Sequence, residues 1–292
     1  MKMMIISLVL AAVSVLGCSG RGSGGKIDVE GVFAYKVGQF DVFLLVEGER
    51  DGNAGILVGA DEAIIDRFIP EDGFSHTTNA ILVRADDINI LIDTGTGAEG
   101  IIVDKITKLG VSPEQVDYVL LTHLHGDHFG GLQKDGAAVF PNATIYLSGI
   151  EHDFFTRINV NQNAIAALAP YADNTVIFSP GNLGGDLVEI IPGIFAIAAY
   201  GHTPGHTMYQ IQSNNESLLV IGDLLHVALV QFAHPEISAS FDVDPAAAAV
   251  IRRQVLDYSA LNRIPVAGMH IVLPGIGNVS VMGSSFLFAP AR

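Results

Sequence analysis

The sequence of 292 residues contains no tryptophan and only one cysteine, Cys18. A single cysteine excludes a disulfide within the chain, and it also argues against a metal site built from thiolates. Basic residues are scarce as well: 15 Lys and Arg stand against 31 Asp and Glu, which gives a formal net charge of -16. A nucleic-acid partner would need a basic surface to neutralise phosphates, so we expect none.

Long apolar runs are missing except at the start of the chain. There, Lys2 precedes the apolar residues 3–16, which have the length of a secretory signal core and are short for a bilayer span. The run ends in Val15-Leu16-Gly17-Cys18, which resembles a bacterial lipobox. This resemblance implies a lipoprotein signal peptide over residues 1–17 and a lipid anchor on Cys18. We therefore expect an exported lipoprotein on the periplasmic side or in the outer membrane.

Residues 18–26 are rich in Gly and Ser and are expected to form a tether before one folded domain, residues 27–292. Within that domain, strand-type runs alternate with helical ones. Residues 79–84 and 88–92 flank Ala85-Asp86-Asp87 and predict a hairpin. Residues 244–261 predict a long helix with Asp244 as its N-cap and Pro245 at its first position. Strands and helices in both halves of the chain predict a layered α/β protein.

A second helix is predicted over residues 148–157, with Ser148 as the cap and Glu151 three residues later. This spacing is typical of a capping box, in which the two side chains bond to each other's backbone.

Four candidate metal ligands lie within six residues of one another, directly after the apolar run at residues 116–121. They are His123, His125, Asp127 and His128. At an extended strand end, side chains 123 and 125 point the same way, so two imidazoles can bind one cation. Gly126 permits a sharp turn that redirects the next two side chains toward a second cation. The pattern predicts a metal site on a loop after a strand.

Three further candidate segments each follow a predicted strand. They contain His202 and His206 in Gly201–Thr207, Asp223 after Gly222, and His270 after Met269. Strand ends allow a rigid sheet to aim side chains from distant parts of the chain at one point.

The order of these residues resembles the metallo-β-lactamase superfamily over about residues 33–289. The resemblance implies an αββα sandwich, two mixed β-sheets flanked by helices, with two divalent metal ions at one edge. It assigns His123, His125 and His206 to the first metal, Asp127, His128 and His270 to the second, and Asp223 to both. Asp93 and His202 are expected to support these ligands from behind. Zinc is the expected metal, and manganese, cobalt or iron remain alternatives because no thiolate is available.

An aspartate at position 223 resembles the lactonase and phosphotriesterase branches more than many true β-lactamases. Longer stretches, including residues 151–155 and 222–224, resemble the methyl parathion hydrolase and lactonase-like subgroup. That subgroup implies an aromatic tunnel with Trp, whereas Phe155 stands where a Trp would be expected. We therefore rank a neutral lactone or carboxylic ester, such as an acyl-homoserine lactone, as the first substrate class and a phosphotriester as the second. A β-lactam comes third and a non-catalytic metal-binding lipoprotein last; the family also implies a homodimer.

In the expected mechanism, a hydroxide that bridges the two cations attacks the carbonyl or phosphoryl centre. Zinc can lower the pKa of bound water from roughly 15.7 to about 7. Asp127 is expected to hold its metal and to pass a proton to the leaving group. Side chains that could line the substrate pocket are Phe129, Phe154, Phe155, His226 and Phe232. For the phenylalanines, ordinary core packing is the alternative.

Overall fold

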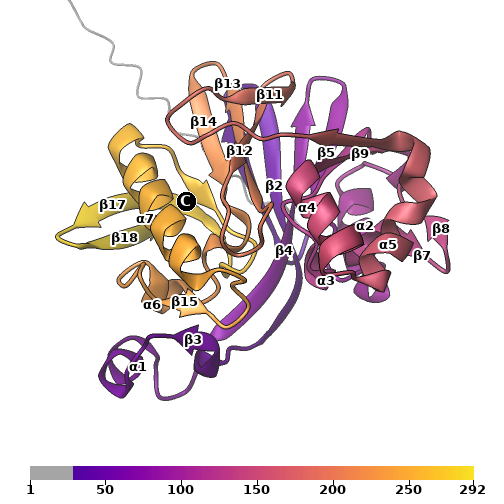
Figure 1. The fold of residues 1–292 in the computed structure, drawn as a ribbon. Helices are drawn as coiled ribbons and strands as arrows, with labels where there is room; N and C mark the ends of the chain where they lie inside the picture. Colours follow the sequence, from indigo (N-terminus) through magenta and orange to yellow (C-terminus); the bar gives the residue numbers. More distant parts are fainter. Residues whose placement is uncertain (1–28) are drawn as a thin grey trace, which may run out of the picture.

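Two seven-stranded sheets pack face to face in the computed structural model, which describes residues 29–292 (Figure 1). Helices cover the outer face of each sheet, so the layers confirm the predicted sandwich of two mixed sheets flanked by helices. The predicted signal peptide, the tether and Cys18 lie outside the described residues. Within residues 29–292, no helix is long and apolar enough to cross a membrane.

The first sheet combines antiparallel and parallel strands. The strands β1, β2, β4 and β5 pair antiparallel, and β5, β6, β9 and β10 pair parallel. In spatial order they are β1 (Val32–Val37), β2 (Phe40–Asp51), β4 (Ser75–Ala85), β5 (Ile88–Ile92), β6 (Tyr118–Leu120), β9 (Thr144–Ser148) and β10 (Thr175–Phe178).

The second sheet is antiparallel except where β14 and β16 pair parallel. Its strands, in spatial order, are β11 (Val188–Ile191), β12 (Ile194–Ala198), β13 (Thr207–Ser213), β14 (Glu216–Val220), β16 (Val266–Ala267), β17 (Ile276–Met282) and β18 (Ser285–Pro290). Two small ribbons pair β3 (Leu57–Val58) with β15 (Ser238–Ala239), and β7 (Gln133–Lys134) with β8 (Ala137–Ala138).

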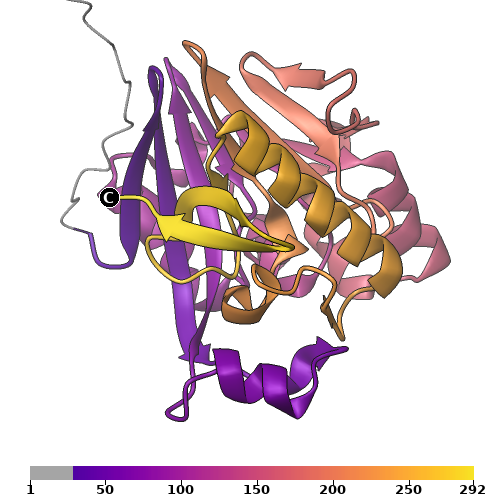
Figure 2. The same cartoon turned by 90° about the vertical axis from the view of Figure 1, so that its left-hand side faces the viewer.

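The helices divide between the two outer faces. On the side of the first sheet lie α2 (Ile101–Lys108), α3 (Gly126–Phe129), α4 (Gly149–Asp153) and α5 (Gln162–Leu168). On the side of the second lie α6 (Ala228–Gln231) and α7 (Pro245–Asn262), and α1 (Glu62–Phe68) stands apart at one end (Figure 2). Helix α7 begins as predicted, because the Asp244 side chain accepts a hydrogen bond from the backbone N of Ala247 at 3.0 Å.

Strand β2 shows why apolar residues follow one another in this sequence without alternating with polar ones. Its side chains alternate, so Val42 and Leu44 pack between the sheets while Phe43 and Leu45 pack under the helices. Because this sheet is covered on both sides, residues 42–47 of the strand are all buried. The interior therefore has three apolar layers: one between the sheets and one under each set of helices.

Two parts of the fold differ from the sequence expectations. The helix predicted over residues 148–157 is α4 followed by a wider π-type turn at Phe154–Ile158. The segment that carries α1 was not predicted, although the Asp61 side chain caps that helix by accepting from the backbone N of Ile64. Helix α1 has only seven residues, and although Ile64 and Phe68 pack against a small apolar cluster, one such pair is too short a pattern to predict a helix.

Candidate metal centre

Four loops meet at one end of the sandwich, and each follows a strand. The first follows β6 and carries residues 122–128, and the second joins β12 to β13 and carries residues 199–206. The third is a 3₁₀ turn, η7 (Gly222–Leu224), after β14, and the fourth follows β16 and carries His270. The strands thus bring together the four segments that carry the candidate ligands. The sequence predicted only that each of these segments follows a strand.

A first group of side chains comprises His123, His125, His202 and Asp223. The Nε2 atom of His202 lies 3.2 Å from Nε2 of His123 and 3.0 Å from Nδ1 of His125. The Oδ2 atom of Asp223 lies 3.4 Å from Nε2 of His202. Three imidazole nitrogens and one carboxylate oxygen therefore surround one point, which is the donor set and spacing of a divalent cation site.

A second group comprises Asp127, His128 and His270. The Nε2 atom of His270 lies 3.6 Å from Oδ2 of Asp127, and Nε2 of His128 lies 3.7 Å from Oδ1 of Asp127. Oδ2 of Asp223 is 3.1 Å from Nε2 of His270 and 3.3 Å from Nε2 of His128. One carboxylate oxygen therefore contacts both groups, so the geometry suits two neighbouring cations.

Unpartnered polar atoms also fit metal binding. Nε2 of His128 and Oδ1 of Asp223 are buried and have no hydrogen-bond partner among the described residues. An unpaired buried polar atom is costly in a folded protein, and a coordinated cation would remove that cost. The donors are nitrogen and oxygen, which fits zinc and also manganese, cobalt or iron.

The two groups differ in how the surrounding charges shift their pKa values. Burial lowers the pKa of His125 to about 4 and holds the pKa of His123 well below its usual value. Burial alone would lower the pKa of His128 and His270 too, but the Asp223 carboxylate raises both. Before metal binds, the first group therefore presents neutral imidazoles, whereas two imidazoles of the second group favour the protonated form.

His206 and His202 both lie beside the first group, but their ring nitrogens have different partners. The ring of His206 is fully buried; its Nδ1 donates to the carbonyl of Ala199 at 3.0 Å and its Nε2 accepts from the backbone N of Asp223 at 3.1 Å. Both nitrogens are therefore used by the backbone, and Nε2 of His202 joins the first group instead. The expectation that His206 holds the first metal and His202 lies behind it stays a prediction, and the structure adds His202 as a neighbour of the first group.

A close approach fixes His206 in this role. A Cβ atom on Gly222 would lie 2.4 Å from Nε2 of His206, and the φ of Gly222 is +55°. Only glycine permits this backbone conformation and this contact together. The imidazole therefore supports the turn that presents Asp223.

Two carboxylates support the loops from behind. Asp93 accepts hydrogen bonds from Nδ1 of His128 at 2.8 Å and from the hydroxyl and backbone N of Thr122 at 2.7 and 2.8 Å. Glu151 accepts from the backbone N of Leu124 at 2.9 Å, so it does not form the expected capping box. The sequence does not reveal this role, because a glutamate three residues into a helix already has a local explanation as part of a capping box.

An apolar cavity of about 570 Å³ opens beside His226 and His270. Phe232 lines it and stacks on Phe288 with ring centroids 4.9 Å apart. His226 links the cavity to the metal groups, because its Nε2 lies 3.2 Å from Oδ2 of Asp223. Other apolar side chains of the cavity are Phe68, Phe74, Leu229, Leu273 and Phe286.

The other candidate pocket phenylalanines lie elsewhere. Phe129 is buried in the core between the first sheet and its helices, and Phe154 packs against the same core. Phe155 is also buried there, but its ring meets the ring of His125 edge-on at 5.8 Å. Core packing therefore accounts for Phe129 and Phe154, whereas Phe155 also borders the first metal group.

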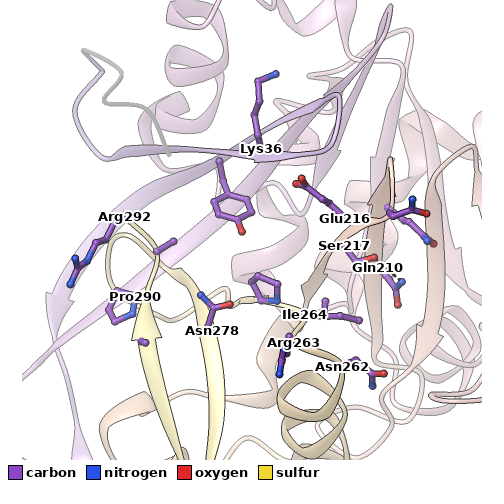
Figure 3. Close-up of a pocket in the computed structure, with 16 residues that line it drawn as sticks. Lys36, Gln210, Glu216, Ser217, Asn262, Arg263, Ile264, Asn278, Pro290 and Arg292 are labelled. Carbon is purple, nitrogen blue, oxygen red and sulfur yellow. Dashed lines mark hydrogen bonds between the residues drawn. The ribbon is translucent and has the colours of Figure 1, made fainter. Parts of the chain in front are cut away.

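A larger hollow of about 1040 Å³ is polar and does not contain the candidate ligands. Figure 3 shows its lining, which includes Gln210, Glu216, Arg263 and Asn278. It lies beside the Ser213 end of β13 and the Glu216 end of β14, whereas His206 and Asp223 lie at the opposite ends of these strands. This hollow is thus separate from the metal centre.

Sequence comparison finds one matching family and several relatives of this chain. A family model described as the metallo-beta-lactamase superfamily matches residues 75–263. An N-acyl homoserine lactonase of Bacillus cereus is 26% identical over 168 residues, which are 48% of this chain and 60% of that protein. A probable metallo-hydrolase of Methanocaldococcus jannaschii is 30% identical over 135 residues, 46% of this chain and 50% of that protein. The chain thus spans about 60% of the length of the first of these relatives.

Solved structures match over most of the chain. The hydrolase AbOPH, described as in the beta lactamase superfamily, superposes with a TM-score of 0.82 at 30% identity, covering 91% of this chain and 99% of that one. AidC, described as a dizinc quorum-quenching lactonase in complex with the product N-hexanoyl-L-homoserine, superposes with a TM-score of 0.77 at 27% identity. That match covers 90% of this chain and 98% of AidC.

Proposed function

Because the chain belongs to the metallo-β-lactamase superfamily, we propose that it is a dinuclear metal-dependent hydrolase that opens lactones or cleaves carboxylic esters with an apolar tail. N-Acyl homoserine lactones are the first candidate substrates. The observation that carries this proposal is the shared oxygen of Asp223, which contacts two ligand groups beside an apolar cavity. The lactonase activities of the B. cereus relative and of AidC support the substrate class.

We assign the ligands from the distances above. His123 and His125 would hold the first metal, Asp127, His128 and His270 the second, and Asp223 would contact both. The third nitrogen of the first metal is His206 by the family resemblance, and His202, whose Nε2 lies 3.2 Å from Nε2 of His123, is the alternative. Zinc remains the expected metal, since AidC is described as a dizinc enzyme and the donors suit zinc.

Two cations held by these residues would supply Lewis-acid chemistry and would lower the pKa of water at the site. The chain's own contribution is to place and shield the reacting group. Asp127 is the most accessible of the proposed carboxylate ligands, with its side chain 28% exposed, whereas Asp223 is 3% exposed. Burial alone would raise the pKa of Asp127, but the charge of His128 lowers it, so the carboxylate is ionised at rest. We propose that it takes a proton from the attacking water and passes it to the leaving alkoxide at the solvent side.

The apolar cavity suits the uncharged tail of such a substrate. Its volume falls within the roughly 300–1,000 Å³ of typical ligand pockets. A lactone whose ring lies at the metals would have its tail pass His226 and enter between Leu229 and Phe232. The net charge of -16 also favours a neutral substrate over an anionic one.

The test is a substrate panel run on protein of measured metal content. The panel contains N-acyl homoserine lactones of several chain lengths, an aryl ester, paraoxon and a chromogenic cephalosporin. We expect lactone or ester turnover that is lost on chelation and restored by zinc. Protein with two metals bound but no turnover of lactones or esters would defeat the proposed function.

A phosphotriester is the second candidate substrate. Two cations that share a ligand can stabilise both the attacking and the leaving oxygen at phosphorus. The edge-on contact of Phe155 with His125 places one aromatic ring beside the first metal group, where an aryl ester could bind. Faster turnover of paraoxon than of any lactone would establish this alternative.

The N-terminal prediction is a separate proposal. We infer that the chain is exported and held at the membrane through a lipid on Cys18. A Cys18→Ser variant expressed with its full leader should then leave the membrane fraction and lose labelling by a radioactive fatty acid, and unchanged labelling would refute the anchor. The homodimer implied by the family resemblance is tested by sedimentation of the purified protein.

A further inference from the structure

We propose that the mouth of the apolar cavity rests on a phospholipid membrane, from which a substrate with an apolar tail enters the site. The inference rests on the proposed function and deepens it, because it names the surface that delivers the substrate. Contact with the membrane is measured without any turnover, so the membrane contact and the proposed activity can fail separately.

Five large apolar side chains form a rim around the mouth of this cavity and face solvent. They are Leu229 in α6, Val272 and Leu273 in the loop before β17, Met282 at the end of β17, and Leu287 in β18. Each is between 41% and 60% exposed. All five line one cavity, and α6 lies beside the β17–β18 hairpin in Figure 1. Apolar side chains that gather in one exposed patch mark a binding surface, whereas scattered ones do not.

The rim and the cavity behind it have few polar groups. No Asp, Glu, Lys or Arg is among the described residues that line them, although the sequence contains 15 basic and 31 acidic residues. The polar side chains of the lining are Ser75, His226 and His270. Protein interfaces carry about one hydrogen bond per 100–200 Å², whereas lipid chains make none. The rim therefore suits a bilayer better than it suits a protein partner.

Charges at the border of the rim indicate which lipid it meets. Arg67 lies over the ring of Phe68 at 5.4 Å, and Arg253 lies over the ring of Phe286 at 5.6 Å; both rings line the cavity. Arginine beside an apolar surface can keep its stem on that surface while its guanidinium reaches a lipid phosphate. Asp66 next to Arg67 and the net charge of -16 disfavour anionic lipid and also a second copy of this chain. We therefore expect a zwitterionic phospholipid.

The start of the described chain lies beside the same rim. Val29 and Leu273 line one hollow of about 560 Å³, and Leu273 also lines the apolar cavity. Residues 18–28 precede Val29 and span at most about 40 Å when fully extended. The lipid proposed on Cys18 would thus hold the rim within this distance of the bilayer. Such a link raises the effective concentration of the membrane at the rim, so a weak contact becomes sufficient.

A membrane at the rim would change how the substrate reaches the metals. Esters and lactones with long apolar tails partition from water into a bilayer. A tail that leaves the bilayer between Leu229 and Leu273 would enter the cavity without crossing water. The polar end of the substrate would then lie near His226, whose Nε2 is 3.2 Å from Oδ2 of Asp223.

The lack of tryptophan in the chain allows a direct test, because one introduced Trp is then the only such fluorophore. Full-length Leu287→Trp is compared with full-length Leu261→Trp on phosphatidylcholine vesicles with and without brominated chains. Leu261 is 83% exposed on α7 and does not line the cavity. Both variants keep the same N-terminal segment, so an anchor would bring both equally to the vesicle. Circular dichroism first establishes that each variant folds, and Met282→Trp is a second probe on the rim.

We expect the emission of Leu287→Trp and Met282→Trp to shift to shorter wavelength on vesicles and to be quenched by brominated lipid. Leu261→Trp should show neither change. Binding is then measured by vesicle sedimentation in the Cys18→Ser background, where Leu287→Glu should weaken the partition coefficient about tenfold. Leu261→Glu is the matched control and should leave the partition coefficient near its starting value.

Three outcomes overturn the inference. The first is a folded Leu287→Trp that is bound to vesicles but keeps the emission of a Trp in water, and the second is a folded full-length protein that does not bind the vesicles. The third is a blue shift of Leu287→Trp that grows with protein concentration in the absence of lipid, because a second copy would then cover the rim. A protein that passes the vesicle test but hydrolyses no lactone or ester refutes the proposed function and leaves the membrane contact standing.

Discussion

Glu151 Oε2 accepts a hydrogen bond from the backbone N of Gly205 at 2.9 Å, and the two residues touch so closely that a Cβ on Gly205 would lie 2.1 Å from the backbone N of Glu151. The same oxygen accepts from the hydroxyl of Thr203 at 2.7 Å, and the other oxygen accepts from the backbone N of Leu124. One buried carboxylate thus joins the loop of His123 and His125 to the loop of His202.

Replacing this carboxylate by an amide should loosen both loops. In Glu151→Gln, the amide nitrogen must face a donor, either the N–H of Leu124 or the pair at Thr203 and Gly205. A buried donor left unpaired costs about 1–3 kcal/mol, so we expect a loss of this size in the free energy of unfolding and weaker binding of the first metal. Denaturant unfolding and zinc titration measure these changes. Glu71→Gln, at an exposed position, is the control, and equal effects of the two variants would contradict the role of Glu151.

Gly205 should tolerate no side chain. Gly205→Ala places a methyl group against the backbone of α4, which can yield only by moving the helix or the loop. Overpacking of this kind typically costs about 1–3 kcal/mol. Gly126→Ala, between His125 and Asp127, is a stringent control because no atom lies within 4 Å of the added carbon. Melting temperatures should therefore fall for Gly205→Ala and stay near the wild-type value for Gly126→Ala.

The third nitrogen ligand of the first metal is directly testable. By the ligand set that the resemblance implies, His206→Ala should lose the first metal and His202→Ala should keep both. Elemental analysis of the two purified variants, after circular dichroism has shown that each folds, gives the metal count. Loss of the first metal from His202→Ala with full retention in His206→Ala would assign it instead to His202, whose Nε2 lies near the nitrogens of His123 and His125.

Sequence spacing could place the ligands at strand ends, because β6, β14 and β16 are apolar runs that stop directly before them. Spacing alone does not separate His202 from His206, since both lie in one loop; the family resemblance made that choice. The hydrogen bonds of Asp242 to His202 and Arg252 could not be predicted, because they join elements that are distant in the chain. The sheet order, likewise, follows from long-range strand pairing that local patterns do not encode.

Metal binding at the two groups should depend differently on pH. The pKa of His128 is raised well above its usual value and that of His270 is raised, so near neutral pH these rings tend to hold protons that a metal must displace. The pKa of His125 is lowered to about 4 and that of His123 is lowered well below its usual value, so these rings have no proton to lose. Raising the pH from about 6.5 to 8 should strengthen binding of the second metal, by up to about 100-fold per pH unit if both rings release a proton. Binding of the first metal should change little. Chelator competition at several pH values measures how the affinity for each metal changes with pH. A steeper change for the first metal would contradict the inference that the imidazoles of the second group are the protonated ones.

The apolar cavity predicts how chain length affects substrate binding. Leu229 lines it while remaining 47% exposed, so Leu229→Gln should alter the cavity wall with little effect on folding. Full burial of a leucine contributes about 1.5–3 kcal/mol, and a half-exposed one that a substrate tail covers should contribute a fraction of this. We therefore expect KM for a long-chain lactone to rise about threefold to tenfold, while KM for the shortest lactone and kcat for both stay near the wild-type values. Leu261→Gln is the control, because Leu261 is 83% exposed on α7 and does not line the cavity. Equal KM changes for short and long chains would mean that the tail lies elsewhere.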